Sequence, residues 1–200
     1  MTPTVLIFLK APVAGAVKTR LAVDVGEAEA LRIYRWLAER QLAAIPSTWP
    51  VEVHFSPAPA AAEMKAWLGE AKGRTFWPQV EAGLGERLRH AMAGAFARSA
   101  EAVFLIGGDC PGLNAKVLNR ARDALREHDV VMGPACDGGY YLLGMTTARP
   151  ELLHDIAWSS DRVASQTRQR VEAAGLALAE LNPLRDVDRL ADWRAVERRD

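Results

Sequence analysis

The stretch Ala102-Val-Phe-Leu-Ile106 leads directly into Gly107-Gly-Asp-Cys-Pro-Gly112, and this passage decides the fold class. A short apolar run that ends in turn-forming residues predicts a buried strand. Further strands are predicted over residues 5–9, 51–55, 75–80, 129–132, 140–143 and 176–181. Between them, helices are predicted over residues 27–45, 60–68, 86–99, 114–128, 160–174 and 188–198. Strands that alternate with helices predict an α/β layer fold with a mostly parallel sheet.

Three residues mark the boundaries of these elements. Asn114 is expected to cap the start of its helix, because Asn accepts a hydrogen bond from the first free N–H groups. Gly175 is expected to end the helix before it. Pro78 restricts the strand at 75–80 to an edge or a bend of the sheet, because proline cannot donate to a neighbouring strand.

The composition indicates one ordinary globular domain that spans residues 1–200. The 25 Lys and Arg residues balance 25 Asp and Glu residues, which argues against a dedicated nucleic-acid binder. No run approaches the roughly 20 apolar residues of a membrane helix, and no signal peptide is evident. Cys110 and Cys136 lie far apart and have no metal-ligand spacing, so no disulfide framework is expected. A cytoplasmic location is therefore predicted.

The loop after the first strand contains only cationic charges. Lys10, Lys18 and Arg20 are its charged residues, and Gly15 lets the backbone approach a ligand closely. Ligands of such sheets bind beyond the carboxyl ends of the strands, so this loop suits a nucleotide di- or triphosphate. The alternative is a solvated turn with three surface cations.

Carboxylates follow two later strands. Asp109 comes directly after the strand at 102–106, where a single carboxylate can bridge Mg²⁺ to phosphates. Alternatively, Asp109 caps the next helix or closes a turn. Asp186 and Asp188 follow the last strand and could complete a metal site with Asp109, although Asp188 could also cap the final helix.

Three other loops contain residues suited to ligand binding. Asp137 precedes Gly138 and Gly139, which is foremost the signature of a hairpin turn. Gly83 and Gly85 precede a helix whose N–H groups could face a base or phosphate, or they form an ordinary glycine loop. Trp158, with Ser159 and Ser160, could line a pocket, although Ser160 could also cap its helix.

Taken together, these stretches resemble the bacterial glycosyltransferase-A-like transferases described as radical-SAM/selenodomain-associated or arsenosugar-biosynthesis-type glycosyltransferases. The matching segments are 8–21, 79–88, 106–112, 133–144, 158–160 and 186–188, which occur in order along nearly the whole chain. A more distant similarity extends to 2-phospholactate guanylyltransferase and to the molybdenum-cofactor nucleotidyltransferases. The resemblance implies a nucleotide-diphospho-sugar transferase (GT-A-like) sandwich with a mixed, mainly parallel central sheet.

The resemblance also implies roles for individual residues. The nucleotide would be bound by Lys10, Gly15, Lys18, Arg20, Gln79, Gly83, Gly85 and Arg87. Asp109 and Asp186 would ligate Mg²⁺ or Mn²⁺. The sugar or acceptor would contact Asp137, Gly138, Tyr140 and Trp158. Asp109, Asp137 and Lys18 would carry the catalytic step.

The sequence departs from the family pattern in three places. The usual Trp-Ser-Thr is Trp158-Ser-Ser160, and the usual Asp-x-Asp-Thr ends in Arg189. The paired carboxylates of many sugar transferases are reduced to Asp109 alone, next to Cys110.

The leading hypothesis is a metal-dependent glycosyltransferase that moves a sugar from a nucleotide-sugar to a small acceptor. The first alternative is a guanylyltransferase-like nucleotidyltransferase that uses a nucleoside triphosphate and releases pyrophosphate. The second is a nucleotide-binding module that has lost catalysis. All three predict a nucleotide and, for the enzymes, a small-molecule acceptor as partners, with neither nucleic acid nor a membrane span.

Overall fold

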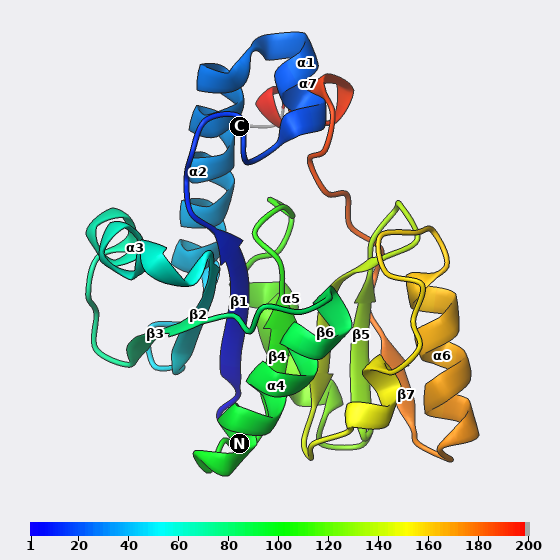
Figure 1. Cartoon of the computed structure of the whole chain (residues 1–200). Helices are drawn as coiled ribbons and strands as arrows, with labels where there is room; N and C mark the ends of the chain where they lie inside the picture. The colour runs from blue at the N-terminus through cyan, green and yellow to red at the C-terminus, as the bar shows by residue number, and fades with distance from the viewer. Residues whose placement is uncertain (199–200) are drawn as a thin grey trace.

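Seven strands form one sheet in the computed structural model of the chain, which describes residues 1–198 (Figure 1). They are β1 (Thr4–Lys10), β2 (Val51–Ser56), β3 (Arg74–Pro78), β4 (Val103–Ile106), β5 (Val130–Pro134), β6 (Tyr140–Met145) and β7 (Leu178–Glu180). Their order across the sheet is β3-β2-β1-β4-β6-β5-β7. Each predicted strand is therefore present, and β3 with Pro78 is an edge strand, as expected.

The sheet is mixed but mainly parallel. Strands β1 to β4 pair in parallel, β5 pairs in parallel with β7, and β6 runs antiparallel between β4 and β5. The reversal follows from the short connection of β6 to β5, because two strands joined by a tight turn can only run antiparallel. Alternation of strands with helices did not predict this reversal, whereas the Asp-Gly signal at residue 137 did.

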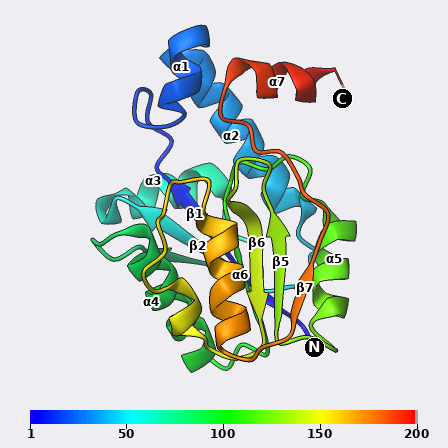
Figure 2. The same ribbon diagram turned by 90° about the vertical axis from the view of Figure 1, so that its right-hand side faces the viewer.

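Helices cover both faces of the sheet (Figure 2). They are α1 (Thr19–Val25), α2 (Glu27–Ala44), α3 (Ala61–Leu68), α4 (Leu84–Ala97), α5 (Ala115–Ala124), α6 (Val163–Ala173) and α7 (Leu190–Glu197), with short 3₁₀ turns η1 (Ala58–Ala60) and η2 (Pro150–Leu153). One core lies between the sheet and α2, α3 and α5; the other lies between the sheet and α4, α6 and η2. Successive β1 residues serve both cores: Val5 and Ile7 face the first, and Leu6 faces the second.

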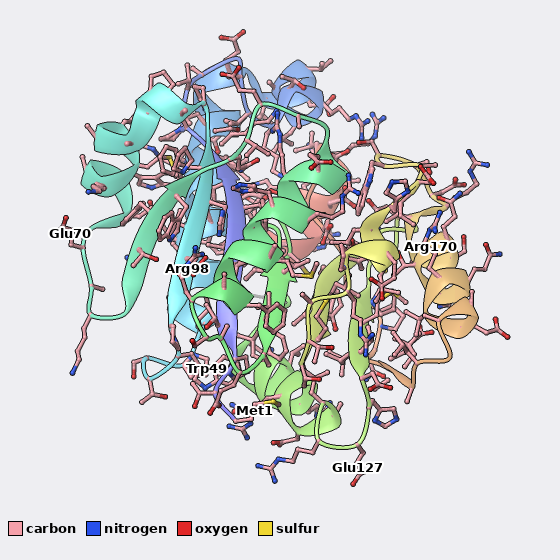
Figure 3. The ribbon with its side chains drawn as sticks, turned by 60° about the horizontal axis from the view of Figure 1, so that its bottom comes forward. Met1, Trp49, Glu70, Arg98, Glu127 and Arg170 are labelled. Atoms are coloured by element: carbon pink, nitrogen blue, oxygen red, sulfur yellow. The ribbon has the colours of Figure 1, made fainter. Side chains whose placement is uncertain are left out.

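A third, smaller core lies above the carboxyl end of β1. There α1, α7 and the first part of α2 form what we call the helical cap (Figure 1). Its buried residues are Leu21, Ala30, Ile33, Leu37, Val187 and Trp193. The ring of Trp193 meets that of Trp36 edge to face at 5.2 Å. The chain begins at the opposite end of the sheet, where Met1, Trp49 and Arg98 lie (Figure 3).

Several predicted helix boundaries are confirmed and others are wrong. The Asn114 side chain accepts the Val117 N–H at the start of α5, and Gly175 follows α6 with a positive φ of 66°. In contrast, α1 forms where only a loop was predicted. This seven-residue helix buries a single residue, Leu21, in the cap, so its formation depends on tertiary contacts rather than on a periodic apolar face.

The helix-capping alternatives for three site residues are wrong. Asn114, not Asp109, caps α5. Arg189, not Asp188, is the N-cap of α7. The Asp192 side chain accepts the Arg189 N–H and so completes the cap at the start of this helix. Arg162, not Ser160, is the N-cap of α6, which begins later than predicted. Asp109 and Asp188 are therefore free of the helix-capping role that competed with ligand binding, whereas the Ser160 hydroxyl donates to the Ala157 carbonyl and accepts the Arg162 N–H in the turn before α6.

Candidate functional site

Two adjoining cavities lie between the carboxyl ends of the strands and the helical cap. Their volumes are about 520 Å³ and about 490 Å³. The residues that line both are Phe8, Lys18, Arg20, Leu84, Gly107, Asp109 and Asp188. This shared wall makes them two halves of one site. We call the larger half the acidic half and the smaller half the cationic half, for the charges described below.

Lys18 and Asp109 form the centre of the site. Lys18 Nζ lies 2.7 Å from Asp109 Oδ1 and donates a hydrogen bond of 2.6 Å to the Val187 carbonyl. The Lys18 side chain is only 5% exposed, whereas that of Asp109 is 47% exposed. The Lys18 backbone is left-handed (φ 48°), so the side chain leaves the first loop just before α1 begins. The Val187 N–H in turn donates to the Asp109 carbonyl at 2.9 Å, so three distant segments meet here.

The loop that carries Asp109 is held from below by Gln41 of α2. This buried side chain donates to the Gly107 carbonyl at 3.1 Å and accepts the Cys110 N–H at 3.0 Å. The two bonds flank Asp109 and satisfy backbone groups that burial would otherwise leave unpaired. Nothing in the hydrophobic pattern of α2 singles out Gln41, which the sequence analysis missed.

Asp186 lies beside Asp109 and is the most perturbed carboxylate of the site. Burial, together with the nearby charges of Asp109 and Asp137, raises its pKa to about 7. One of its oxygens, Oδ1, is buried without a hydrogen-bond partner among residues 1–198. A buried carboxylate that lies near like charges and has one oxygen without a partner is stabilised by a cation.

The donor set therefore fits a divalent metal ion. Asp109 and Asp186 supply oxygen ligands, which Mg²⁺ and Mn²⁺ prefer. Within residues 1–198, no group of three or more His, Cys, Asp or Glu side chains has the geometry to hold a metal ion by itself. Two carboxylates whose remaining partners come from substrate phosphates are a common arrangement for Mg²⁺.

Arg20 and Asp188 form a second ion pair at the rim. Arg20 Nη1 lies 2.7 Å from Asp188 Oδ2, and both side chains are largely exposed. This contact connects α1 to the segment before α7, and it places Arg20 on the wall common to both cavities.

The cationic half contains the remaining predicted phosphate- and base-binding side chains. Lys10, Gln79 and Arg87 line it. The Gln79 amide donates to the carbonyls of Leu9 and His54, and its oxygen accepts from Arg87 at 3.3 Å. Arg87 is also anchored to the Ala82 carbonyl at 2.7 Å.

Tyr34 fixes the Lys10 backbone in this half of the site. The Tyr34 hydroxyl accepts the Lys10 N–H and donates to the Lys10 carbonyl, both at 2.8 Å. Burial raises the pKa of Tyr34, so the hydroxyl stays protonated and keeps both bonds. The apolar periodicity of α2 accounts for Tyr34 as a core residue, so no feature of the sequence indicates this contact with Lys10.

The acidic half contains the residues expected to face the sugar or acceptor. Asp137, Tyr140 and Trp158 line it, together with Asp161. Asp137 lies in the β5–β6 turn, where its Oδ1 accepts the Gly139 N–H at 2.9 Å, so the hairpin interpretation is also correct. The rings of Tyr140 and Trp158 meet edge to face at 6.3 Å.

Four predicted glycines do not line either cavity. Gly15 lies against the Glu27 carboxylate, and Gly83 precedes α4 with open space around it. Gly85 packs on Trp158, where an added Cβ would lie 2.5 Å from the indole nitrogen. Gly138 packs on the Asp161 backbone, where an added Cβ would lie 2.2 Å from the carbonyl oxygen. Gly85 and Gly138 therefore position the wall of the acidic half.

Residues 40–160 match the family model described as "Uncharacterized protein conserved in bacteria (DUF2064)". A protein of Desulfovibrio desulfuricans G20, described as a "putative nucleotide-diphospho-sugar transferase", is 32% identical; the match covers 100% of this chain and 88% of that chain, with a TM-score of 0.91. No curated protein matches the chain significantly.

More distant structures share the fold alone. Rv0371C of Mycobacterium tuberculosis H37Rv, solved in complex with manganese, is 16% identical over 98% of both chains, with a TM-score of 0.59. A CMP:2-keto-3-deoxy-manno-octonic acid synthetase complexed with CTP is 13% identical over 98% of both chains, with a TM-score of 0.55. The predicted nucleotide-diphospho-sugar transferase fold, with its mixed, mainly parallel sheet, is confirmed. No helix within residues 1–198 is long and apolar enough to cross a membrane.

Proposed function

This chain belongs to the DUF2064 family, and we propose that its residues 1–200 form a single metal-dependent transferase domain that uses an activated nucleotide. The reaction that the site supports best is transfer of a sugar from a nucleotide-sugar to the hydroxyl group of a small acceptor. A transferase of this class agrees with the description of the 32% identical relative. The radical-SAM or arsenosugar context remains a proposal drawn from the sequence resemblance.

One observation carries the proposal: the Lys18–Asp109 pair lies beside Asp186, whose buried Oδ1 has no partner among residues 1–198. Asp109 and Asp186 would hold the metal, and Mg²⁺ or Mn²⁺ bound there would neutralise charge that develops on the leaving phosphate. Lys10, Arg20 and Arg87 would bind the phosphates and orient the nucleotide from the cationic half. Lys18 would hold Asp109 in place and add positive charge next to the phosphates.

In sugar transfer, the acceptor hydroxyl oxygen bonds to the anomeric carbon while the bond from that carbon to the phosphate oxygen breaks. The nucleoside diphosphate leaves with the bonding electron pair. Asp137 would accept the hydroxyl proton, because the metal would not use this carboxylate and it lies on the β5–β6 turn that lines the acidic half. Tyr140 and Trp158 would position the acceptor.

Nucleotidyl transfer is the second candidate, and a specific feature favours it. The cationic half contains Lys10 and Arg87 in addition to the shared Lys18 and Arg20, which is enough positive charge for a triphosphate. The released product separates the two reactions: a nucleoside diphosphate for sugar transfer and pyrophosphate for nucleotidyl transfer.

The test measures nucleotide binding first and the product of the reaction second. Calorimetry with Mn²⁺ and a panel of nucleotide-sugars and nucleoside triphosphates would identify the donor, and mass spectrometry would identify the product. The Asp109→Ala variant should lose metal-dependent nucleotide binding, whereas Asp123→Ala, which removes an exposed carboxylate on α5, should not. Binding by Asp109→Ala at the wild-type affinity would contradict the assignment. Binding without product from any donor and acceptor would favour the non-catalytic module instead.

A further inference from the structure

We propose that the acceptor carries no anionic group: it is an uncharged hydroxyl compound that packs against an aromatic wall and donates hydrogen bonds to carboxylates. The proposal rests on the proposed function, since an acceptor exists only for a transferase. It narrows the substrate class and disfavours acceptors that react through a phosphate or carry one.

The charges of the site are separated along its length. Lys10 and Arg87 line only the cationic half. Asp137, Asp161 and Asp186 line only the acidic half, where no further Lys or Arg of residues 1–198 joins the lining. The two cations on the shared wall are already paired, Lys18 with Asp109 and Arg20 with Asp188. The acidic half therefore has an excess of negative charge.

A bound metal ion would not reverse this excess where the acceptor lies. A divalent cation between Asp109 and Asp186 would balance those two carboxylates, and the charge of Lys18 would then offset a phosphate of the nucleotide rather than Asp109. Asp137 and Asp161 remain, and no salt bridge within residues 1–198 includes either of them, although the charge of Arg20, which is paired with Asp188, also acts on Asp137. An acceptor with a phosphate or carboxylate group would meet like charge there and would be rejected.

The uncharged surface of the acidic half suits the remaining part of a hydroxyl compound. Tyr140 and Trp158 present aromatic surface, and Leu84, Leu88 and Val163 extend it. Aromatic side chains pack well against C–H groups, while carboxylates accept from hydroxyl donors.

The first experiment uses matched pairs of acceptors with the wild-type chain, Mn²⁺ and the donor that calorimetry identifies. The pairs are glycerol and glycerol 3-phosphate, ribose and ribose 5-phosphate, and glucose and glucose 6-phosphate. Mass spectrometry should detect adducts of the uncharged member of a pair, in several-fold excess over the phosphorylated member. Equal or greater transfer to the phosphorylated members would overturn the proposal.

The second experiment gives an answer even when no member of the panel reacts. Quenching of the Trp158 fluorescence by iodide, caesium and acrylamide reports which charges enter the acidic half. The Trp158 contribution is the difference between the wild type and Trp158→Phe, and each quencher is normalised to free tryptophan amide. Inorganic pyrophosphate with Mn²⁺ occupies the cationic half during the measurement.

Iodide should quench Trp158 several-fold less than caesium or acrylamide, and the Asp137→Asn/Asp161→Asn variant should restore iodide quenching. Iodide quenching as strong as that of caesium in the wild type would overturn the proposal. A failure of the proposed function would be detected by a different measurement, because calorimetry would then show no metal-dependent nucleotide binding. The two failures are therefore distinguishable.

Discussion

The ammonium group of Lys18 lies 2.7 Å from Asp109 Oδ1, although the two residues are 91 positions apart and belong to the loops after β1 and β4. This contact connects the helical cap to the centre of the sheet. Because Lys18 also donates to the Val187 carbonyl, it joins segments near both ends of the chain to the loop that carries Asp109.

The Lys18→Met variant should lose stability by about 1–3 kcal/mol, because it removes a buried cation that satisfies a carbonyl and a half-exposed carboxylate. Urea unfolding would measure the loss. Lys116→Met, which removes an exposed lysine on α5, should change stability by less than about 0.5 kcal/mol and serves as control. Equal effects of the two variants would show that the Lys18 contact contributes nothing.

At high pH the metal-free Asp186→Asn variant should be more stable than the wild type, whereas with Mn²⁺ the wild type should be the more stable of the two. The pKa of Asp186 is raised from its ordinary value near 3.8 to about 7, so the folded state binds the proton more tightly than the unfolded state. Metal-free wild type should therefore lose stability as the pH rises from about 4 to about 7.

Asn does not ionise, so metal-free Asp186→Asn should show a flatter pH profile and exceed the wild type in stability at pH 8. Added Mn²⁺ should stabilise only the wild type, because the variant lacks a carboxylate ligand. Thermal unfolding between pH 5 and pH 8.5, with chelator or with Mn²⁺, measures both effects. Parallel pH profiles for the two proteins would contradict this account.

The Gln41→Leu variant should weaken metal binding without touching a ligand. It leaves the Gly107 carbonyl and the Cys110 N–H unpaired, at a cost of about 1–3 kcal/mol in stability. Calorimetry should show weaker Mn²⁺ binding, since the loop that carries Asp109 is less well held. Gln169→Leu, on the exposed face of α6, is the control. Wild-type metal affinity in a folded Gln41→Leu protein would exclude this positioning role.

The Arg87→Gln variant should bind the nucleotide about tenfold to a hundredfold more weakly, because one charge-assisted contact to phosphate is worth roughly 1.5–3 kcal/mol. Arg89→Gln is a matched control on the same helix, since Arg89 pairs with Glu86 and does not line the site. Calorimetric titration of both variants checks the difference. Equal losses would point to a general effect of α4 charge rather than to a phosphate contact.

The Gly138→Ala variant should be destabilised by about 2–4 kcal/mol, because its φ of 90° is strained for alanine and the new Cβ would collide with the Asp161 backbone. Gly175→Ala shares the positive φ but has open space around it, so it should cost only about 1 kcal/mol. Thermal unfolding of the pair isolates the collision. Similar losses in both variants would show that the β5–β6 turn can move away from Asp161.

Much of the fold follows from local pattern. Val5 to Leu9 and Val103 to Ile106 are apolar runs, so they are expected to be buried in the interior. The periodicity of α2 is that of a helix packed on a sheet. The Asp137-Gly138 turn determines that β6 reverses direction. Such signals act within a few residues, which is why they can be read before the fold is known.

The site was only partly predictable for the same reason. Asp109, Lys18 and Asp186 each follow a strand, and the carboxyl ends of parallel strands meet at one edge of a sheet. Gln41 and Tyr34 lie on a helix whose apolar face accounts for them as core residues, and their bonds to the loops appear only when α2 packs under β1 and β4. Gly85 and Gly138 were expected to face ligand and instead allow close packing of the wall.

The amino-acid sequence by itself determined the strands, the principal helices and the charged loops of this protein, because these depend on residue type and spacing along the chain. Only the tertiary structure decided that α1 is a helix, that Val187 and Asp188 complete a site begun by Lys18 and Arg20, and that anionic and cationic halves lie apart. The contacts of Lys18 and Arg20 with Val187 and Asp188 join segments more than 150 residues apart. Their energy depends on distance in space, which no local pattern records.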